Sequence, residues 1–167
     1  MPRLSRIIGV AIVAVSALFP TLPVSAGQAE NNLLASFEGV WEGRGQVTGP
    51  NAGTVACRMT FRNTAAGELT YSGRCTIPPS GTSFRGKMVY NESRGRFESA
   101  STAQGVTTTT VGRRSGGGLV FSSSGLETRY GTASSTMQLT RSAISMSFQL
   151  VDSDGAVTKT SISMSRS

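Results

Sequence analysis

Histidine is absent from the 167 residues, and the sequence contains only two cysteines and one tryptophan. The absence of histidine excludes Ser-His-Asp and Cys-His catalysis, His-ligated zinc and His-ligated haem, because each of these sites needs an imidazole. Acidic residues are also few, since nine Asp and Glu stand against 16 Lys and Arg. These shortages remove much of the usual enzyme repertoire, and the length is that of one small domain.

Long apolar runs are missing as well. The longest, Ile7 to Leu18, has about 12 residues, whereas a helix that spans a membrane needs about 20. Arg3 and Arg6 precede this run and Val24-Ser25-Ala26 follows it, which is typical of a cleaved signal peptide. We therefore expect residues 1–26 to be removed near Ala26 and the mature protein to be periplasmic or secreted, without a membrane-spanning segment.

The basic excess survives the loss of Arg3 and Arg6, because 14 of the 16 basic residues then remain against nine acidic ones, a net charge of about +5. Lys87 and Lys159 are the only lysines. Arginine binds phosphate and carboxylate through a planar fork of donors, so an anionic partner at the cell envelope is one reading of this charge. Solubility alone is the other reading, and no nucleic acid is expected as a partner.

After a short helical turn predicted at 31–37, apolar and polar residues alternate along the chain with period two. Val55, Cys57, Met59 and Phe61 share one parity, for example, and such alternation is typical of half-buried strands. Glycine, proline and asparagine clusters separate the alternating segments, as expected for hairpin turns. The pattern predicts about ten strands, at 41–48, 54–62, 69–77, 84–90, 96–101, 106–112, 119–123, 136–141, 144–150 and 157–164.

An antiparallel meander of this length has to close or fold into two sheets, because an open sheet would leave long edges exposed. We expect closure into an all-β, up-and-down barrel of about 8–10 strands, covering 39–166, with 27–38 as an N-terminal segment. The second parity is rich in Arg, Thr, Ser and Glu, so an outer-membrane barrel with a lipid-facing apolar row is disfavoured. The predicted barrel is water-soluble, with its apolar face inside.

The nine acids fall in turns or at outward positions, so no pair of carboxylates meets on the inner face. Together with the missing histidine, this predicts a protein that is not an enzyme, and we expect no cofactor and no metal site. The segment Asp152-Ser153-Asp154-Gly155 resembles the start of a calcium loop, but it lacks the following Glu. Asp-Gly between alternating strands is typical of a hairpin turn instead.

The two cysteines test the strand register independently of hydrophobicity. A hairpin centred near Ala66 places Cys57 directly opposite Cys75, and it also places Phe61 opposite Tyr71. In an oxidising compartment two opposed cysteines on one face form a disulfide. The alternative, a redox-active or metal-binding pair, lacks a Cys-x-x-Cys spacing and a histidine.

The segment Gly39-Val40-Trp41-Glu42-Gly43-Arg44-Gly45 resembles the first strand of calycins, the lipocalin and fatty-acid-binding-protein barrels. In lipocalins the Trp of this Gly-x-Trp pattern packs at the closed end of the barrel beneath an Arg from a late strand. The resemblance implies that role for Trp41, with Arg141 or Arg166 as the partner. The glycine pattern is also similar to haem-binding barrels of the nitrobindin type, which bind iron through a histidine that this chain lacks.

A second resemblance is to periplasmic inhibitors of serralysin-type metalloproteases, which are small exported barrels with a Gly-x-Trp first strand and one disulfide. Trp41, Cys57 and Cys75 occur in the corresponding order. Those inhibitors insert their mature N-terminus into the protease cleft, so the resemblance implies that role for residues 27–32.

The large inward side chains either line a ligand pocket or fill the barrel. Small inward residues favour some unfilled volume: Gly43, Gly45, Gly73, Gly86, Ser99, Ser101, Thr108 and Thr110. The leading hypothesis is a non-catalytic barrel that binds a small, largely apolar ligand. Its predicted lining is Trp41, Met59, Phe61, Tyr71, Phe84, Met88, Tyr90 and Phe97.

The outer face suggests the alternative functions. With the first hairpin centred near Asn51, Arg44 lies beside Arg58, and the disulfide register then places Arg58 beside Arg74. Arg85 or Lys87 continues this row on the next strand. Adjacent like charges are destabilising unless an anion neutralises them, so the row is a candidate site for anionic lipid, lipopolysaccharide or an acidic protein. Scattered solvated arginines are the other interpretation.

Overall fold

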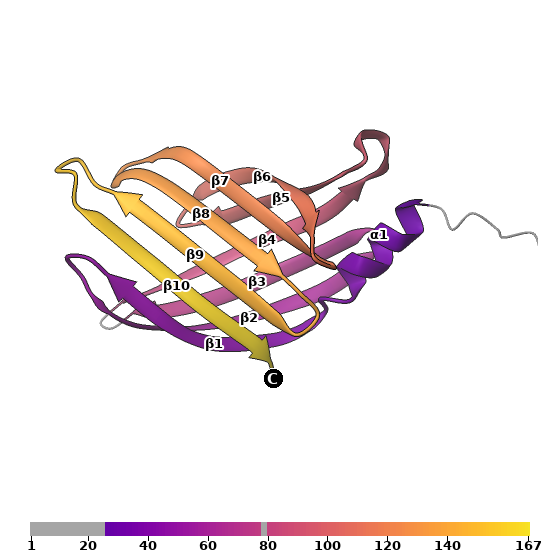
Figure 1. Cartoon of the computed structure of the whole chain (residues 1–167), viewed down its shortest axis with the longest axis horizontal. Coiled ribbons are helices and arrows are strands. Elements are labelled where there is room, and N and C mark those ends of the chain that lie inside the picture. The colour runs from indigo at the N-terminus through magenta and orange to yellow at the C-terminus, as the bar shows by residue number, and fades with distance from the viewer. Residues whose placement is uncertain (1–25, 78–79) are drawn as a thin grey trace, which may run out of the picture.

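The computed structural model describes residues 26–77 and 80–167 as one helix, a short 3-10 turn at Glu92–Arg94 and ten antiparallel strands. Each strand pairs with its neighbours in sequence, and β1 also pairs with β10, so the sheet closes (Figure 1). The predicted all-β, up-and-down barrel is confirmed. Helix α1 covers Ala26–Ala35, and the strands are β1 Gly39–Thr48, β2 Gly53–Ala65, β3 Glu68–Ile77, β4 Ser80–Asn91, β5 Arg96–Ala103, β6 Val106–Ser115, β7 Gly118–Thr128, β8 Gly131–Leu139, β9 Ala143–Val151 and β10 Val157–Arg166.

Burial follows the predicted alternation. In β2 the apolar residues from Val55 to Phe61 are buried while most of those between them are exposed. Helix α1 lies at one end of the barrel (Figure 1), where Leu33, Leu34 and Phe37 join the inward side chains in one hydrophobic core. Removing apolar surface from water contributes about 25 cal/mol per Å², so this shared core drives closure of the α1 end.

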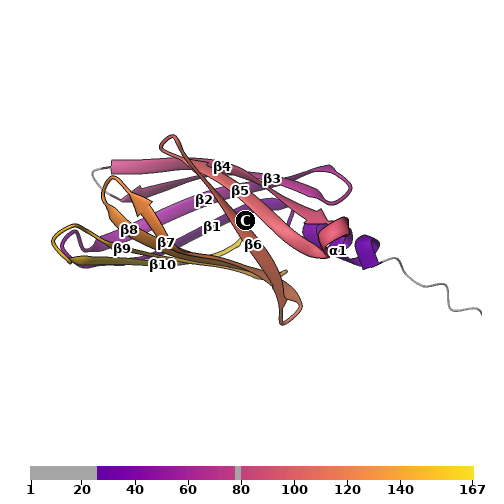
Figure 2. The same ribbon diagram turned by 90° about the horizontal axis from the view of Figure 1, so that it is seen from above.

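The barrel is flattened, with β2–β5 in one wall and β8–β10 in the other (Figure 2). Strands β6 and β7 join the walls, but they pair only near α1, from Gly112 opposite Phe121 to Ser115 opposite Gly118. Away from α1 they diverge, and no further pair joins them within the described ranges. A bulge in β7 between Ser123 and Leu126 accompanies this divergence, with Gly125 in the left-handed region at φ 65°. We call this opening the β6–β7 gap.

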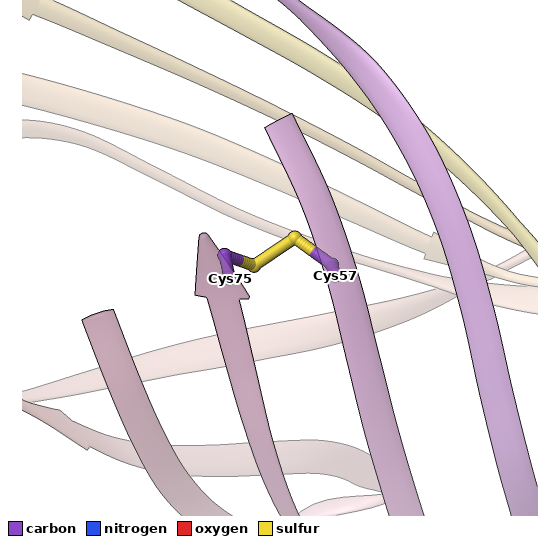
Figure 3. The surroundings of a disulfide bond; sticks show 2 residues. All are labelled: Cys57 and Cys75. Carbon is purple, nitrogen blue, oxygen red and sulfur yellow. A yellow bond between two sulfur atoms is a disulfide. The ribbon is translucent and has the colours of Figure 1, made fainter. Parts of the chain in front are cut away.

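The disulfide hairpin forms as predicted from the positions of the two cysteines. Cys57 and Cys75 are directly opposite each other on β2 and β3 and are bonded (Figure 3). Phe61 is opposite Tyr71 in the same register. A bulge at Asn63/Ala65 lies beyond these pairs and leaves them unchanged. Hydrophobic alternation and the two cysteines therefore agree on one register.

The first hairpin differs from its predicted register. Glu42, not Arg44, is opposite Arg58, and Arg44 is opposite Ala56. The reason is that Gly53 belongs to β2 and pairs with Val47, so the turn centres near Pro50 and every pairing moves by two residues. The prediction that Arg44 lies beside Arg58 is therefore wrong.

Several strands are longer than predicted, and β7 and β8 differ most. β7 continues past Ser123 to Thr128, because its glycine forms a bulge rather than a strand end, and β8 begins already at Gly131. The helix is also longer than the turn predicted at 31–37. The predicted signal peptide, residues 1–26, lies outside the described residues except for Ala26. Among the described residues, no helix is both long and apolar enough to cross a membrane.

Candidate functional site

The α1 end is closed by a set of contacts around Trp41. The indole Nε1 donates to the carbonyl of Phe37, 3.0 Å away, and the Arg166 guanidinium lies 4.7 Å from the ring centroid. Arg166 also donates to the carbonyls of Ser36, at 2.8 Å, and Glu38. Of the two arginines that the calycin resemblance suggested, Arg166 is therefore the one over the Trp.

The residues predicted to line a pocket lie mostly in this core. Trp41, Met59 and Met88 have no exposed surface, and Phe61, Tyr71 and Phe97 are nearly as buried. Phe84 and Tyr90 are half-buried and pack against the cluster. The hydroxyl of Tyr71 shares a buried hydrogen bond with Ser99, at 3.3 Å. These side chains fill the α1 half of the barrel.

Two of the small inward residues do not leave open volume. A Cβ at Gly73 would collide with the Phe84 ring, and one at Gly86 would collide with the ring of Tyr71. The aromatic side chains thus occupy the space that these glycines vacate. The expectation of unfilled volume is wrong at these two positions, because a large residue on the neighbouring strand covers each of them.

The half of the lumen away from α1 is less filled. Phe148 belongs to the inward row of β9, where it is paired with Ser135 on β8 and Thr160 on β10. It is nevertheless 42% exposed, whereas inward Ile144 at the α1 end of the same strand is fully buried. Half-buried inward hydroxyls surround this part of the lumen, on Thr108, Thr110, Ser123 and Ser135.

The predicted lining did not include Phe148, although the alternation in β9 indicates its inward position. The alternation of Ile144, Met146 and Phe148 already placed Phe148 on the inner face. What the pattern did not show was the β6–β7 gap, where the pairing between these two strands ends. Val106, at the inward start of β6, is also exposed, at 48%.

The outer face of β2–β5 carries a groove of about 670 Å³, which we call the arginine groove. Arg58 and Arg74 are directly opposite each other, and Arg85 is opposite Ser72, one position diagonal from Arg74. The structure therefore brings three of the four predicted anion-binding arginines together, and Arg44 does not line the groove. The lining is Arg58, Thr60, Ser72, Gly73, Arg74, Ser83, Phe84, Arg85, Thr102, Gln104 and Gly105.

Charge in the arginine groove is only partly balanced. Arg58 forms an ion pair with Glu42 on β1. Within residues 26–77 and 80–167, no carboxylate lies within ion-pair distance of Arg74 or Arg85. The continuation of the row at Lys87 is also neutralised, because its Nζ lies 3.2 Å from a carboxylate oxygen of Glu68.

The N-terminal segment and the acidic turn have structural partners. Residues 27–32, which the inhibitor resemblance would insert into a protease, lie in α1, where Glu30 forms an ion pair with Arg114 at 2.8 Å. A carboxylate oxygen of Asp152 accepts from the amides of Asp154 and Ala156, as in a side-chain-stabilised turn. No group of three or more Cys, Asp and Glu in the described part of the chain could hold a metal ion.

No known protein family and no curated protein sequence matches this chain. Its fold is similar to that of Rv2717c from M. tuberculosis, with a TM-score of 0.62 and 17% identity over 86% of this chain and 98% of the other. It is also similar to the S-type phycobiliprotein lyase CPES from Guillardia theta, with a TM-score of 0.56 and 10% identity over 84% and 97%.

These similarities concern the fold alone, and they support a calycin-like barrel that is compatible with ligand binding. They also correct the expectation that the protein is not an enzyme. That expectation rested on the missing histidine and the missing inward acid pair, yet a barrel of the same architecture is a lyase in Guillardia theta. Fold does not determine function, so the absence of histidine and of an inward acid pair does not exclude catalysis by a barrel of this architecture.

Proposed function

We propose that the barrel binds a small, largely apolar molecule in the half of its lumen away from α1, with entry through the β6–β7 gap. The observation that carries this proposal is the 42% exposure of Phe148 at an inward position. An aromatic side chain inside a barrel is normally covered by its neighbours, as Tyr71 is at 5% exposure. A ligand over Phe148 would remove this apolar surface from water.

The surrounding side chains indicate the character of the ligand. Ligand pockets are mostly apolar, with a few polar groups that orient the bound molecule. Here Phe148 and half-buried Leu126 and Leu150 supply apolar surface, while hydroxyls such as those of Thr108 and Thr110 supply hydrogen bonds. Of the eight residues predicted as the lining, half-buried Phe84 lies farthest toward this site, since it pairs with Ala103 at the far end of β5.

A neutral lipophilic dye tests the proposal without interference from surface charge. N-phenyl-1-naphthylamine should gain fluorescence with the native protein and saturate, because it would leave water for the lumen. Phe148→Arg should weaken this binding about tenfold or more, since a charge in an apolar site has to be desolvated. Val111→Arg is the matched control, because Val111 is equally exposed at 42% but faces outward on β6. Dye binding that survives in Phe148→Arg, or that fails in both variants, would contradict the lumen site.

Native mass spectrometry of protein purified gently from its host gives a second, independent measurement. A retained molecule of small-ligand mass that is lost in Phe148→Arg would support the lumen site and give the ligand's formula. Protein that never carries a ligand and does not bind the dye would argue against it.

We further propose that the protein acts outside the cytoplasm after removal of residues 1–26. The Cys57–Cys75 disulfide supports this, because such bonds persist in oxidising compartments. The intact mass of protein recovered from the periplasm or medium should correspond to a chain that begins at Gly27. A mass that includes the first 26 residues would contradict processing.

A further inference from the structure

The arginine groove is lined mainly by outward residues of β2–β5, and the inward residues Gly73 and Phe84 also border it. We propose that it binds a hydroxyl-bearing phosphomonoester, such as a phosphorylated sugar, with Arg74 and Arg85 holding the phosphate. Both arginines come from adjacent strands and point to the same face, because Arg74 is opposite Ser83 and Arg85 is opposite Ser72. They are thus diagonal neighbours across one strand pair, within reach of a common anion.

The charge balance favours a phosphate over a carboxylate. Glu42 compensates Arg58, so the groove keeps two positive charges on Arg74 and Arg85. A phosphomonoester carries a charge of about −1.5 to −2 at neutral pH and matches two guanidinium groups, whereas a carboxylate carries only −1. Guanidinium also pairs with phosphate through two parallel hydrogen bonds, which adds to its selectivity for this group.

The free protein has an electrostatic reason to take up an anion here. Arg58 and Arg74 are directly opposite each other across β2 and β3, and like charges at such positions destabilise a sheet. Uncharged residues fit the neighbouring outward positions of the same two strands, where Thr60 is opposite Ser72. A bound phosphate would convert this repulsion into attraction.

The other residues that line the groove fit a ligand whose organic part bears hydroxyl groups. Ser72, Ser83 and Thr102 belong to this lining, and hydroxyl groups both donate and accept hydrogen bonds, as sugar hydroxyls do. The Thr102 hydroxyl already shares a hydrogen bond with that of Thr107, at 2.9 Å. The open groove, of about 670 Å³, has room for an organic frame beside a phosphate. A phosphate together with its organic frame is therefore the better fit.

The β5–β6 turn borders the groove. Gln104 has φ 49°, and it is the one non-glycine residue with positive φ among the described residues. With Gly105, at φ 80°, it forms the tight β5–β6 turn, a position that Asn or Gly would occupy with less strain. The side-chain amide donates to Thr82 Oγ1 at 3.1 Å, which anchors Gln104 beside the groove.

Calorimetry with glucose 6-phosphate at low salt and neutral pH tests this proposal, with gluconate as the carboxylate-bearing comparison. The native protein should bind glucose 6-phosphate more tightly than gluconate. Arg74→Gln and Arg85→Gln should each raise the dissociation constant about tenfold or more, because each removes a charge-assisted hydrogen-bonding group. Both side chains lie on the surface, so circular dichroism should confirm that the variants remain folded.

Arg62→Gln is the matched control, because it removes one outward arginine from β2, four residues from Arg58, that does not line the groove. It should change the dissociation constant by less than about twofold. An equal loss in Arg62→Gln would show diffuse attraction to a basic surface and would overturn the site. Equal affinity for gluconate, or no binding of either compound by the native protein, would overturn it as well.

Lipid vesicles identify the source of the phosphate. Vesicles of phosphatidylcholine with phosphatidic acid present a phosphomonoester on a membrane, and pure phosphatidylcholine vesicles are the comparison. Binding to the first vesicles that Arg74→Gln removes would assign the site to a lipid headgroup, and binding of glucose 6-phosphate alone would assign it to a free phosphorylated compound. Phe148→Arg should leave every one of these measurements unchanged, so failure of the lumen proposal and failure of this one are distinguishable.

Discussion

Arg166 on the last strand stacks on Trp41 of the first, with the guanidinium carbon 4.7 Å from the ring centroid. The two residues are register partners where β1 and β10 pair to close the barrel. Arg166 also donates to the carbonyls of Ser36 and Glu38, in the segment between α1 and β1. One side chain thus connects the closing strand pair to the segment that leads from the helix.

Arg166→Lys should lower the free energy of unfolding by about 1–3 kcal/mol, because lysine keeps the charge but loses the planar stack and the fork of donors. Urea unfolding followed by Trp41 fluorescence measures this difference. Arg141→Lys, an exposed change after β8, should stay within about 0.5 kcal/mol of the native protein. Equal effects of the two substitutions would show that the stack adds no stability.

Gly43 lies where β1 and β10 approach closely, and a Cβ there would collide with the carbonyl oxygen of Ser163. Gly43→Ala should therefore destabilise the barrel by about 1–3 kcal/mol, through displacement of β10. Gly53→Ala is the matched control, because nothing lies within 4 Å of its Cβ position, and it should be neutral or slightly stabilising. Thermal unfolding of both variants tests this, and a neutral Gly43→Ala would contradict the close approach.

Replacing both Cys57 and Cys75 by Ala should lower the free energy of unfolding by about 3 kcal/mol in the chain-entropy model, since the bond closes a loop with a sequence separation of 18. The fold should persist, because the inward rows on either side of the disulfide are unchanged. Urea unfolding measures the loss. Alkylation of denatured native protein should find no free thiol, and two free thiols would contradict the hairpin register.

Arg58 and Arg74 should respond differently to the same substitution, although they are opposite each other. Arg74→Thr should stabilise the protein slightly, by a few tenths of a kcal/mol at low salt, because it removes a like charge. Arg58→Thr removes the same repulsion but also the ion pair with Glu42, so its effect should be smaller or of opposite sign. Both effects should shrink in high salt, and identical effects would contradict the role of Glu42.

The pKa of Glu98 is held below its ordinary value, first by a hydrogen bond from Arg96 and then by those from Asn91 and Arg94. A carboxyl with a lowered pKa in the folded state stabilises the fold above its unfolded pKa and loses this contribution as the pH falls through the folded pKa. Arg96→Gln should raise the pKa of Glu98, measured by carbon NMR titration, and should weaken the loss of stability on acidification.

Glu68 is the internal control for this titration. Its pKa is lowered mainly by the Thr64 hydroxyl and then by Lys87, so Arg96→Gln should leave it unchanged. Parallel shifts of both carboxyls would indicate a general change in the barrel instead of the loss of one contact.

The strands, their inward faces and the disulfide hairpin could all be predicted from local sequence patterns. Period-two alternation shows directly which side chains face the core, and Cys57 and Cys75 allow only one register once they share a face. The calycin resemblance also indicated the role of Trp41, with Arg141 or Arg166 as its partner, and the structure places Arg166 there.

The register of β1 with β2, the filling of the lumen and the position of both proposed sites depend on how distant strands pack together. A turn centre that moves by one residue shifts every cross-strand pair by two, which brought Glu42 instead of Arg44 to Arg58. Whether Gly86 leaves a void depends on Tyr71 of the neighbouring strand. The β6–β7 gap likewise depends on how all ten strands close, so local alternation alone does not predict the space around Phe148.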